Sequence, residues 1–317
     1  MSNERSPTVS VVMAVYNVAP YVADTLRSAL GQTLTDIEVI VADDGSTDNT
    51  AEFAERAADH RTRVLRLPHR GPVPTLNRAI AEAKGRYLAI LDGDDLWDRD
   101  KLARHVAVMD ECPTSDLTFS LSRTIDEHGR DLGIVSRVWQ GPLPFERLLV
   151  DNVVYSGSAV VLRLAVLRAV GGFDESLPAG YDHDLWLKIA QHRPGNVRCL
   201  PEILLSYRRR PGQISRDWRL MEACGRQIIA RHSVCCGERA VVLEREALCN
   251  LYRYLAVLNY EAGETVQGLV LMARSLLASP AVFAKSRRSY LVAGALCARA
   301  VLPTPIFRVL EGLRSRC

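Results

Sequence analysis

Short apolar runs alternate with amphipathic stretches along the first third of the chain. Four apolar runs have the length and continuity of buried strands, at residues 9–15, 37–42, 64–67 and 87–91. Apolar positions at helical spacing fill the intervals, at residues 21–30, 48–58 and 75–84. Ser46 or Thr47 is expected to cap the second of these helices by accepting a backbone N–H. Strands that alternate with helices predict an open, mostly parallel sheet flanked by helices.

The pattern is less regular after residue 97 and changes in character after Pro211. Helices are predicted at 98–111 and 182–192, with strands at 117–121 and 158–162. Beyond Pro211 the strand signals end and long amphipathic segments follow, at residues 219–233, 239–261 and 265–278, with a last helix pair around Pro303 and Pro305. We therefore predict an α/β domain at residues 1–212 and an all-α C-terminal region at 213–317.

Composition places the chain among globular proteins. Of its 317 residues, 48% are hydrophobic and 24% are charged, which is enough to build a sizeable core. The net charge of +3 is too small to indicate a nucleic-acid partner. The polar start at residues 1–7 does not resemble a secretion signal, and no apolar run is long enough to span a membrane. The eight cysteines form no Cys-x-x-Cys pair, so we expect reduced thiols in a cytoplasmic protein.

Acidic residues follow two of the predicted strands. Asp43 and Asp44 end the second strand, and Asp92, Asp94 and Asp95 follow the fourth around one glycine. Carboxyl ends of parallel strands are where such sheets bind ligands. Carboxylate oxygens suit Mg²⁺ or Mn²⁺, which are typically held by one or two protein carboxylates together with water and substrate phosphates. The acidic turns therefore indicate either a site for a metal and a diphosphate or ordinary polar turns.

Five motifs decide between these interpretations. They are Val-Ser-Val-Val-Met-Ala-Val-Tyr-Asn at 9–17, Asp-Asp-Gly-Ser-Thr-Asp at 43–48, Asp-Gly-Asp-Asp at 92–95, Gly-Gly-Phe-Asp-Glu at 171–175 and Asp-His-Asp-Leu-Trp-Leu at 182–187. In this order and spacing, the chain from residue 9 to about residue 215 resembles the family 2 glycosyltransferases. The resemblance implies the Rossmann-like GT-A fold. It also implies non-processive transfer of a sugar from a nucleotide-diphosphate donor to a hydroxyl, with inversion at the anomeric carbon.

The resemblance assigns roles to single residues. Tyr16 would stack on the nucleobase, Asp44 would contact the base or ribose, and Asp92 would lie near the ribose. Asp94 would hold Mn²⁺ or Mg²⁺, and Asp182 would be the general base. The donor expected first is a UDP-sugar, and the acceptor is a hydroxyl in the biosynthesis of cell-surface or secreted glycans or glycolipids.

Two positions depart from the family pattern. Tyr181 stands where the family usually has a glutamate, so the proton affinity of Asp182 is expected to differ. Arg210 stands where the family often has a histidine that reaches the metal, and a guanidinium has no lone pair to offer. Arg210 is interpreted either as a partner of the diphosphate or as part of a solvated basic loop. His69, in a loop before the fourth strand, is interpreted as structural.

A lipid-linked glycan at the inner membrane face is one hypothesis for the acceptor. Basic residues gather late in the chain, at residues 208–210, at Arg287 with Arg288 and at Arg314 with Arg316. The apolar segment 290–302 contains Arg299 and is too short to span, so its helix would lie in the membrane interface. The other interpretation is a solvated basic face.

Three other functions are compatible with the predicted fold. Residues 213–218 come close to the Gln-x-x-Arg-Trp signature of processive polysaccharide synthases, but the tryptophan lies one place too late. A nucleotidyltransferase would need a glycine-rich basic loop, which residues 14–20 do not supply. A catalytically silent nucleotide-sugar-binding module is the third alternative. The joint presence of Asp44, Asp92, Asp94 and Asp182 argues against it.

Overall fold

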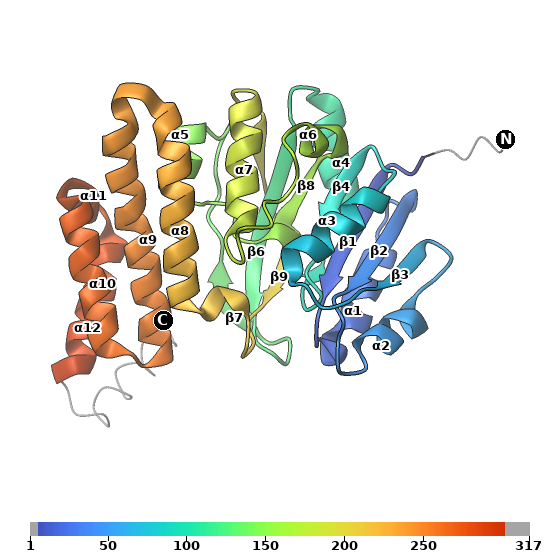
Figure 1. Cartoon of the computed structure of the whole chain (residues 1–317), viewed down its shortest axis with the longest axis horizontal. Coiled ribbons are helices and arrows are strands. Elements are labelled where there is room, and N and C mark those ends of the chain that lie inside the picture. The colour runs from blue at the N-terminus through green and yellow to red at the C-terminus, as the bar shows by residue number, and fades with distance from the viewer. Residues whose placement is uncertain (1–5, 302–317) are drawn as a thin grey trace. The chain divides into compact units, whose positions relative to one another are not determined.

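The structure is a computed structural model that describes residues 6–301 (Figure 1). These residues divide into two compact units, residues 6–148 with 152–213, and residues 149–151 with 214–301. The first unit holds the sheet and the second is helical. The assignment of residues 1–212 and 213–317 as separate domains stays a prediction.

A nine-stranded sheet organises the first unit, in the order β3-β2-β1-β4-β8-β6-β9-β5, with β7 paired to β6. Strands β3, β2, β1 and β4 are mutually parallel, as predicted. Beyond them, β8 runs antiparallel to β4 and β6, and β9 runs parallel to β6. The strands are β1 Val9–Val15, β2 Ile37–Asp43, β3 Thr62–Arg66, β4 Tyr87–Ile90, β5 Leu96–Trp97, β6 Leu117–Ile125, β7 Asp131–Val135, β8 Val160–Arg163 and β9 Val197–Arg208.

The predicted helices of the first unit are present with ends shifted by a few residues, and α5 was not predicted. Asn49, and not Ser46 or Thr47, precedes α2, so the predicted cap was wrong. The Ser46 hydroxyl instead accepts the backbone N–H of Asn17 at 3.0 Å and ties the end of β1 to that of β2. The helices are α1 Ala19–Leu30, α2 Thr50–Ala57, α3 Pro72–Glu82, α4 Lys101–Glu111, α5 Phe145–Val150, α6 Leu164–Ala169 and α7 Tyr181–His192.

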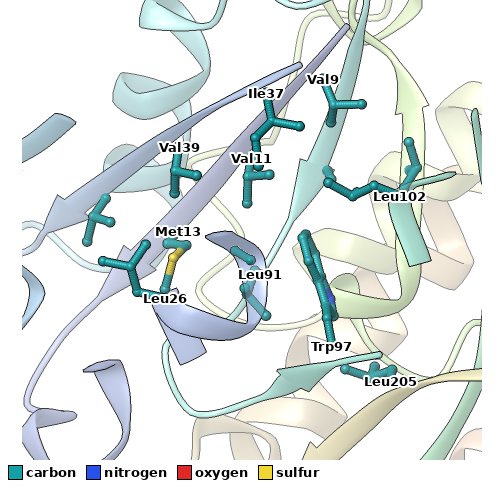
Figure 2. Close-up of a cluster of buried hydrophobic side chains, with 14 of the residues drawn as sticks. Val9, Val11, Met13, Leu26, Ile37, Val39, Leu91, Trp97, Leu102 and Leu205 are labelled. Carbon is teal, nitrogen blue, oxygen red and sulfur yellow. The ribbon is translucent and has the colours of Figure 1, made fainter. Parts of the chain in front are cut away.

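One face of the parallel strands carries the main core cluster (Figure 2). Alternate residues of a strand point to opposite faces, and Val9, Val11 and Met13 of β1 share one face. They pack with Leu26 of α1 and Leu102 of α4. Helix α3 contacts β1 and β2 without contributing to this cluster, so it covers the opposite face. The two layers fix the carboxyl ends of β1, β2 and β4 side by side (Figure 1).

A buried lysine supports the segment next to the acidic turn. Lys101 is fully buried, and burial holds the pKa of its amine well below the ordinary value. Its Nζ donates to the carbonyl of Ala159 at 2.9 Å, and the indole Nε1 of Trp97 donates to the carbonyl of Ser158 at 2.8 Å. The side chains of Lys101 and Trp97 therefore hold the 3₁₀ turn Gly157–Ala159 in place. Trp97 is a packing residue, as its burial shows.

The second unit is helical, as predicted. Gly268 packs so closely that a Cβ there would lie 2.6 Å from Leu296, and Asp217 caps α8 by accepting two backbone N–H groups. No helix within residues 6–301 is long and apolar enough to cross a membrane. Of the two helices predicted on either side of Pro303 and Pro305, the first is the helix Arg287–Val301 and the second lies outside the described residues. The helices are α8 Trp218–Ser233, α9 Ala240–Ala262, α10 Thr265–Ala278, α11 Pro280–Lys285 and α12 Arg287–Val301.

Candidate active site

The acidic turn after β4 is packed tightly against the end of β1. A Cβ on Gly93 would lie 2.8 Å from a methyl carbon of Val15, so the turn needs glycine at this position. The backbone N–H of Asp92 donates to the Ser158 hydroxyl at 2.9 Å. The turn is thus fixed from the strand and from the 3₁₀ segment, and the positions of Asp92 and Asp94 are set by backbone packing.

The acids of this turn repel one another and the acid at the start of α7. Burial, followed by the charges of Asp94 and Asp182, raises the pKa of Asp92 to about 7. Burial, followed by the charges of Asp94 and Asp92, holds the pKa of Asp95 well above its usual range. Asp92 and Asp182 line one pocket, together with Leu76, Ile90, Gly157, Phe173 and Tyr181. The structure therefore brings together three of the acids singled out in the sequence, Asp92, Asp94 and Asp182.

The repulsion predicts an effect of Asp92→Asn on stability. A carboxyl with a folded pKa of about 7 keeps a proton that the unfolded chain releases near pH 4, so its contribution to stability falls as pH rises between these values. The penalty is complete above pH 7, and asparagine removes it. In metal-free protein, we expect Asp92→Asn to raise the melting temperature at pH 8 more than at pH 5. Exposed Asp24→Asn is the control, and an equal shift at both pH values would contradict the assignment.

Asp182 lies in the first turn of α7, after Gly180 in the left-handed conformation. One of its carboxylate oxygens accepts the backbone N–H of His183 at 2.7 Å, and burial raises the pKa of the carboxyl. Burial and the charges of Asp92 and Asp182 likewise raise the pKa of the Tyr181 hydroxyl, so it stays neutral. A carboxylate with a raised pKa is a stronger base, which suits proton abstraction near neutral pH.

Tyr16 and Asp44 form a second group at the ends of β1 and β2. The Tyr16 ring stacks on His69, with ring centroids 4.3 Å apart, and His69 Nδ1 lies 2.9 Å from an Asp44 carboxylate oxygen. Asp44 also accepts the backbone N–H groups of Arg70 at 2.8 Å and Gly71 at 2.9 Å. Asp44 thus shapes the loop beside Tyr16. The structure places His69 in the candidate site, which its position in an aperiodic loop did not indicate.

Arg208 and Arg210 contact the acids of the turn after β4. The Arg210 guanidinium donates from Nε to a carboxylate oxygen of Asp94 at 2.5 Å, so the interpretation of Arg210 as a solvated loop residue was wrong. The backbone N–H of Arg208 donates to a carboxylate oxygen of Asp95 at 2.8 Å. Neither contact was visible in the sequence, because 116 and 113 positions separate the partners.

The residues present fit a hard divalent cation. Asp92 and Asp94 offer carboxylate oxygens, and burial and the neighbouring acids keep the pKa of Asp92 raised although the charge of Arg210 lowers it. Within residues 6–301 no group of three or more His, Cys, Asp or Glu side chains is arranged to hold a metal ion. One or two carboxylates with substrate phosphates and water are a common ligand set for Mg²⁺.

Comparison with solved structures identifies the fold class of the chain. The fold is the GT-A fold of glycosyltransferases. The fragment 1–349 of TarS from S. aureus, in complex with UDP, superposes with a TM-score of 0.61 and 20% identity, over 98% of this chain and 91% of the fragment. The mannosyltransferase PcManGT from Pyrobaculum calidifontis, in complex with GDP-Man and Mn²⁺, superposes with a TM-score of 0.61 and 22% identity, over 94% and 87%. The fold class predicted from the sequence is confirmed.

The sequence comparison gives the family. The family model described as "Glycosyl transferase family 2" matches residues 10–167. Chondroitin synthase from Pasteurella multocida is 28% identical over 189 residues, which are 59% of this chain and 19% of the synthase. The chain belongs to glycosyl transferase family 2, as the five motifs indicated. The matched part of the chain covers between 19% and 65% of the length of its curated relatives.

Proposed function

We propose that the chain is an inverting, non-processive, metal-dependent glycosyltransferase that moves a sugar from a nucleotide-diphosphate donor to a hydroxyl. The observation that carries the proposal is the pocket shared by Asp92 and Asp182, two acids 90 positions apart in the sequence, with Asp94 beside them. The UDP in the TarS structure and the GDP-Man and Mn²⁺ in the PcManGT structure support a nucleotide-sugar donor and a divalent cation. A UDP-sugar remains the first choice of donor.

The side chains divide the reaction between them. Asp182 takes the proton from the acceptor hydroxyl as that oxygen attacks the anomeric carbon. Tyr16 stacks on the nucleobase, and Asp44 holds the loop that frames it. Asp92 would lie near the ribose, and Asp94 would hold the cation. A bound Mn²⁺ or Mg²⁺ supplies charge neutralisation for the leaving diphosphate.

A thermal-shift screen of nucleotide sugars tests the proposal. A ligand that binds only the folded state raises the melting temperature, by an amount set by its concentration relative to its Kd. We expect one nucleotide sugar to raise the melting temperature more with Mn²⁺ than without it. Nucleoside monophosphates are the matched control, because they lack the diphosphate. No shift with any nucleotide sugar would contradict the proposed function.

Two alternatives make different predictions in an assay. A silent binding module would show the thermal shift without donor hydrolysis, whereas a processive synthase would release long polymers. Donor hydrolysis together with transfer of single sugars would support the non-processive transferase over both alternatives.

The acceptor and the cellular location also stay proposals. Helix α12 exposes Arg287 and Arg288 beside exposed Tyr290 and Leu291. A basic and apolar helix surface of this kind is typical of contact with anionic membranes. We propose a cytoplasmic enzyme with peripheral membrane contact and a lipid-linked acceptor. Flotation of the folded chain with anionic vesicles, against neutral vesicles as control, measures that contact.

A further inference from the structure

Arg210 and Arg208 are held in different ways. The Arg208 side chain is buried, and its guanidinium donates to the backbone carbonyls of Asp94 at 2.7 Å and of residues 126 and 127 at 3.2 Å each. The Arg210 side chain is 21% exposed, and its Nε donates to the Asp94 carboxylate. Arg208 is therefore a fixed part of the fold. Arg210 is paired with the carboxylate assigned to the metal.

The backbone around Arg210 is braced, so its side chain can change partner without a loop rearrangement. The Gln213 side chain accepts the backbone N–H of Arg210 at 3.1 Å and donates to the carbonyl of Arg208 at 2.7 Å. The Arg210 guanidinium also lies 5.9 Å from the centre of the Tyr21 ring. Rotation of the side chain alone would remove the guanidinium from Asp94.

A guanidinium and a divalent cation compete for one carboxylate. The Nε of Arg210 already uses an Asp94 oxygen, and its positive charge would repel an incoming Mn²⁺. A diphosphate offers the guanidinium an alternative partner, because arginine binds phosphate oxygens through two parallel N–H donors, whereas Arg210 bonds to Asp94 through Nε. Release of Arg210 to the diphosphate would free Asp94 for the metal.

We propose that Arg210 is a donor-binding residue that exchanges Asp94 for the donor diphosphate, and that this exchange couples metal binding to nucleotide binding. The inference rests on the proposed function. Coupling is reciprocal, so the nucleotide strengthens Mn²⁺ binding by the same factor by which Mn²⁺ strengthens nucleotide binding. The competition predicts that loss of Arg210 strengthens the binding of Mn²⁺ alone and weakens the binding of the nucleotide. A purely structural role for Arg210 does not predict these opposite changes.

The test measures both affinities in the wild type and in Arg210→Gln. Free Mn²⁺ is followed by electron paramagnetic resonance, alone and with UDP or GDP, and nucleotide binding by calorimetry at saturating Mn²⁺. In Arg210→Gln we expect Mn²⁺ alone to bind about tenfold more tightly and the nucleotide about tenfold more weakly, the size of one charge-assisted hydrogen bond. Weaker or unchanged Mn²⁺ binding in this variant would overturn the inference.

Two further variants control for charge and folding. Arg209→Gln removes the same charge from the neighbouring position, whose guanidinium lies 3.4 Å from the Tyr155 hydroxyl, and it should change neither affinity by more than about twofold. Arg210→Lys keeps a cation near Asp94 and decides the question if Arg210→Gln does not fold. It should bind Mn²⁺ alone as the wild type does and bind the nucleotide more weakly, and unchanged nucleotide affinity would overturn the inference.

Failure of this inference is distinguishable from failure of the proposed function. Independent binding of Mn²⁺ and nucleotide to the wild type would overturn the exchange at Arg210 and leave the transferase standing. Binding of neither UDP nor GDP to the wild type would overturn both.

Discussion

Asp182→Asn is expected to lower kcat by a factor of about 10² to 10⁴, which is the usual contribution of a general base. Asparagine keeps the size of the side chain and its acceptance of the His183 N–H, but it cannot take the proton of the acceptor hydroxyl. The affinity for the nucleotide should stay nearly unchanged, because this acid is assigned to the acceptor side. Steady-state kinetics with the donor and acceptor, beside calorimetry with the nucleotide, separate the two effects.

The pH dependence of activity provides a second test of Asp182 as the general base. Burial raises the pKa of Asp182, so wild-type activity should rise with pH as this carboxyl loses its proton. The rise starts at higher pH than an ordinary aspartate would give, and Asp182→Asn should lack that limb. Asp24→Asn on α1, whose exposed carboxylate pairs with Arg27, is the control. Wild-type activity and pH profile in Asp182→Asn would show that another residue is the base.

Asp94→Ala is expected to remove donor hydrolysis that depends on Mn²⁺, with a loss of about 10² to 10³ at saturating metal. The variant lacks the carboxylate assigned to the metal, so the charge that grows on the diphosphate is no longer neutralised. Release of the nucleoside diphosphate is measured with and without Mn²⁺ and after chelation. The wild type should lose activity on chelation, and the variant should show the same low rate in all three conditions.

Asp100→Ala is the matched control for Asp94→Ala, because its carboxylate is exposed and only 6 positions further along the chain. It should keep wild-type hydrolysis and its response to Mn²⁺. Hydrolysis by Asp94→Ala that still rises with Mn²⁺ would move the metal to another acid, with Asp92 as the next candidate. Loss of the Arg210 partner is checked by melting temperature, since a destabilised fold would lower activity for another reason.

The sequence predicted the parallel half of the sheet well and its other half less well. Strands β1, β2 and β4 are continuous apolar runs because both of their faces are covered by helices. Strand β5 has two residues and was missed, since so short a segment has no periodicity. It pairs with β9, so its extended conformation depends on a strand more than a hundred positions away.

The sequence likewise predicted some residues of the candidate site and missed others. The acids that follow β2 and β4 could be assigned to one edge of the sheet, because carboxyl ends of neighbouring parallel strands meet there. His69 and Ser158 could not, since they lie in loop and turn segments whose positions depend on contacts with Asp44 and Asp92. The structure adds a second ring, His69, beside Tyr16, whereas the motif indicated Tyr16 alone.

The sequence by itself determined the alternation of strands and helices, the membership of glycosyl transferase family 2 and the identity of the acids Asp44, Asp92, Asp94 and Asp182. These follow from local periodicity and from residue types at fixed spacing, which are properties of the linear chain. Only the tertiary structure decided which charges meet: it raised the pKa of Asp92 by burying it and by bringing Asp94 and Asp182 near it, and it paired Arg210 with Asp94. Burial and Coulomb interactions depend on distances in space, and these are fixed by packing between segments that the sequence keeps far apart.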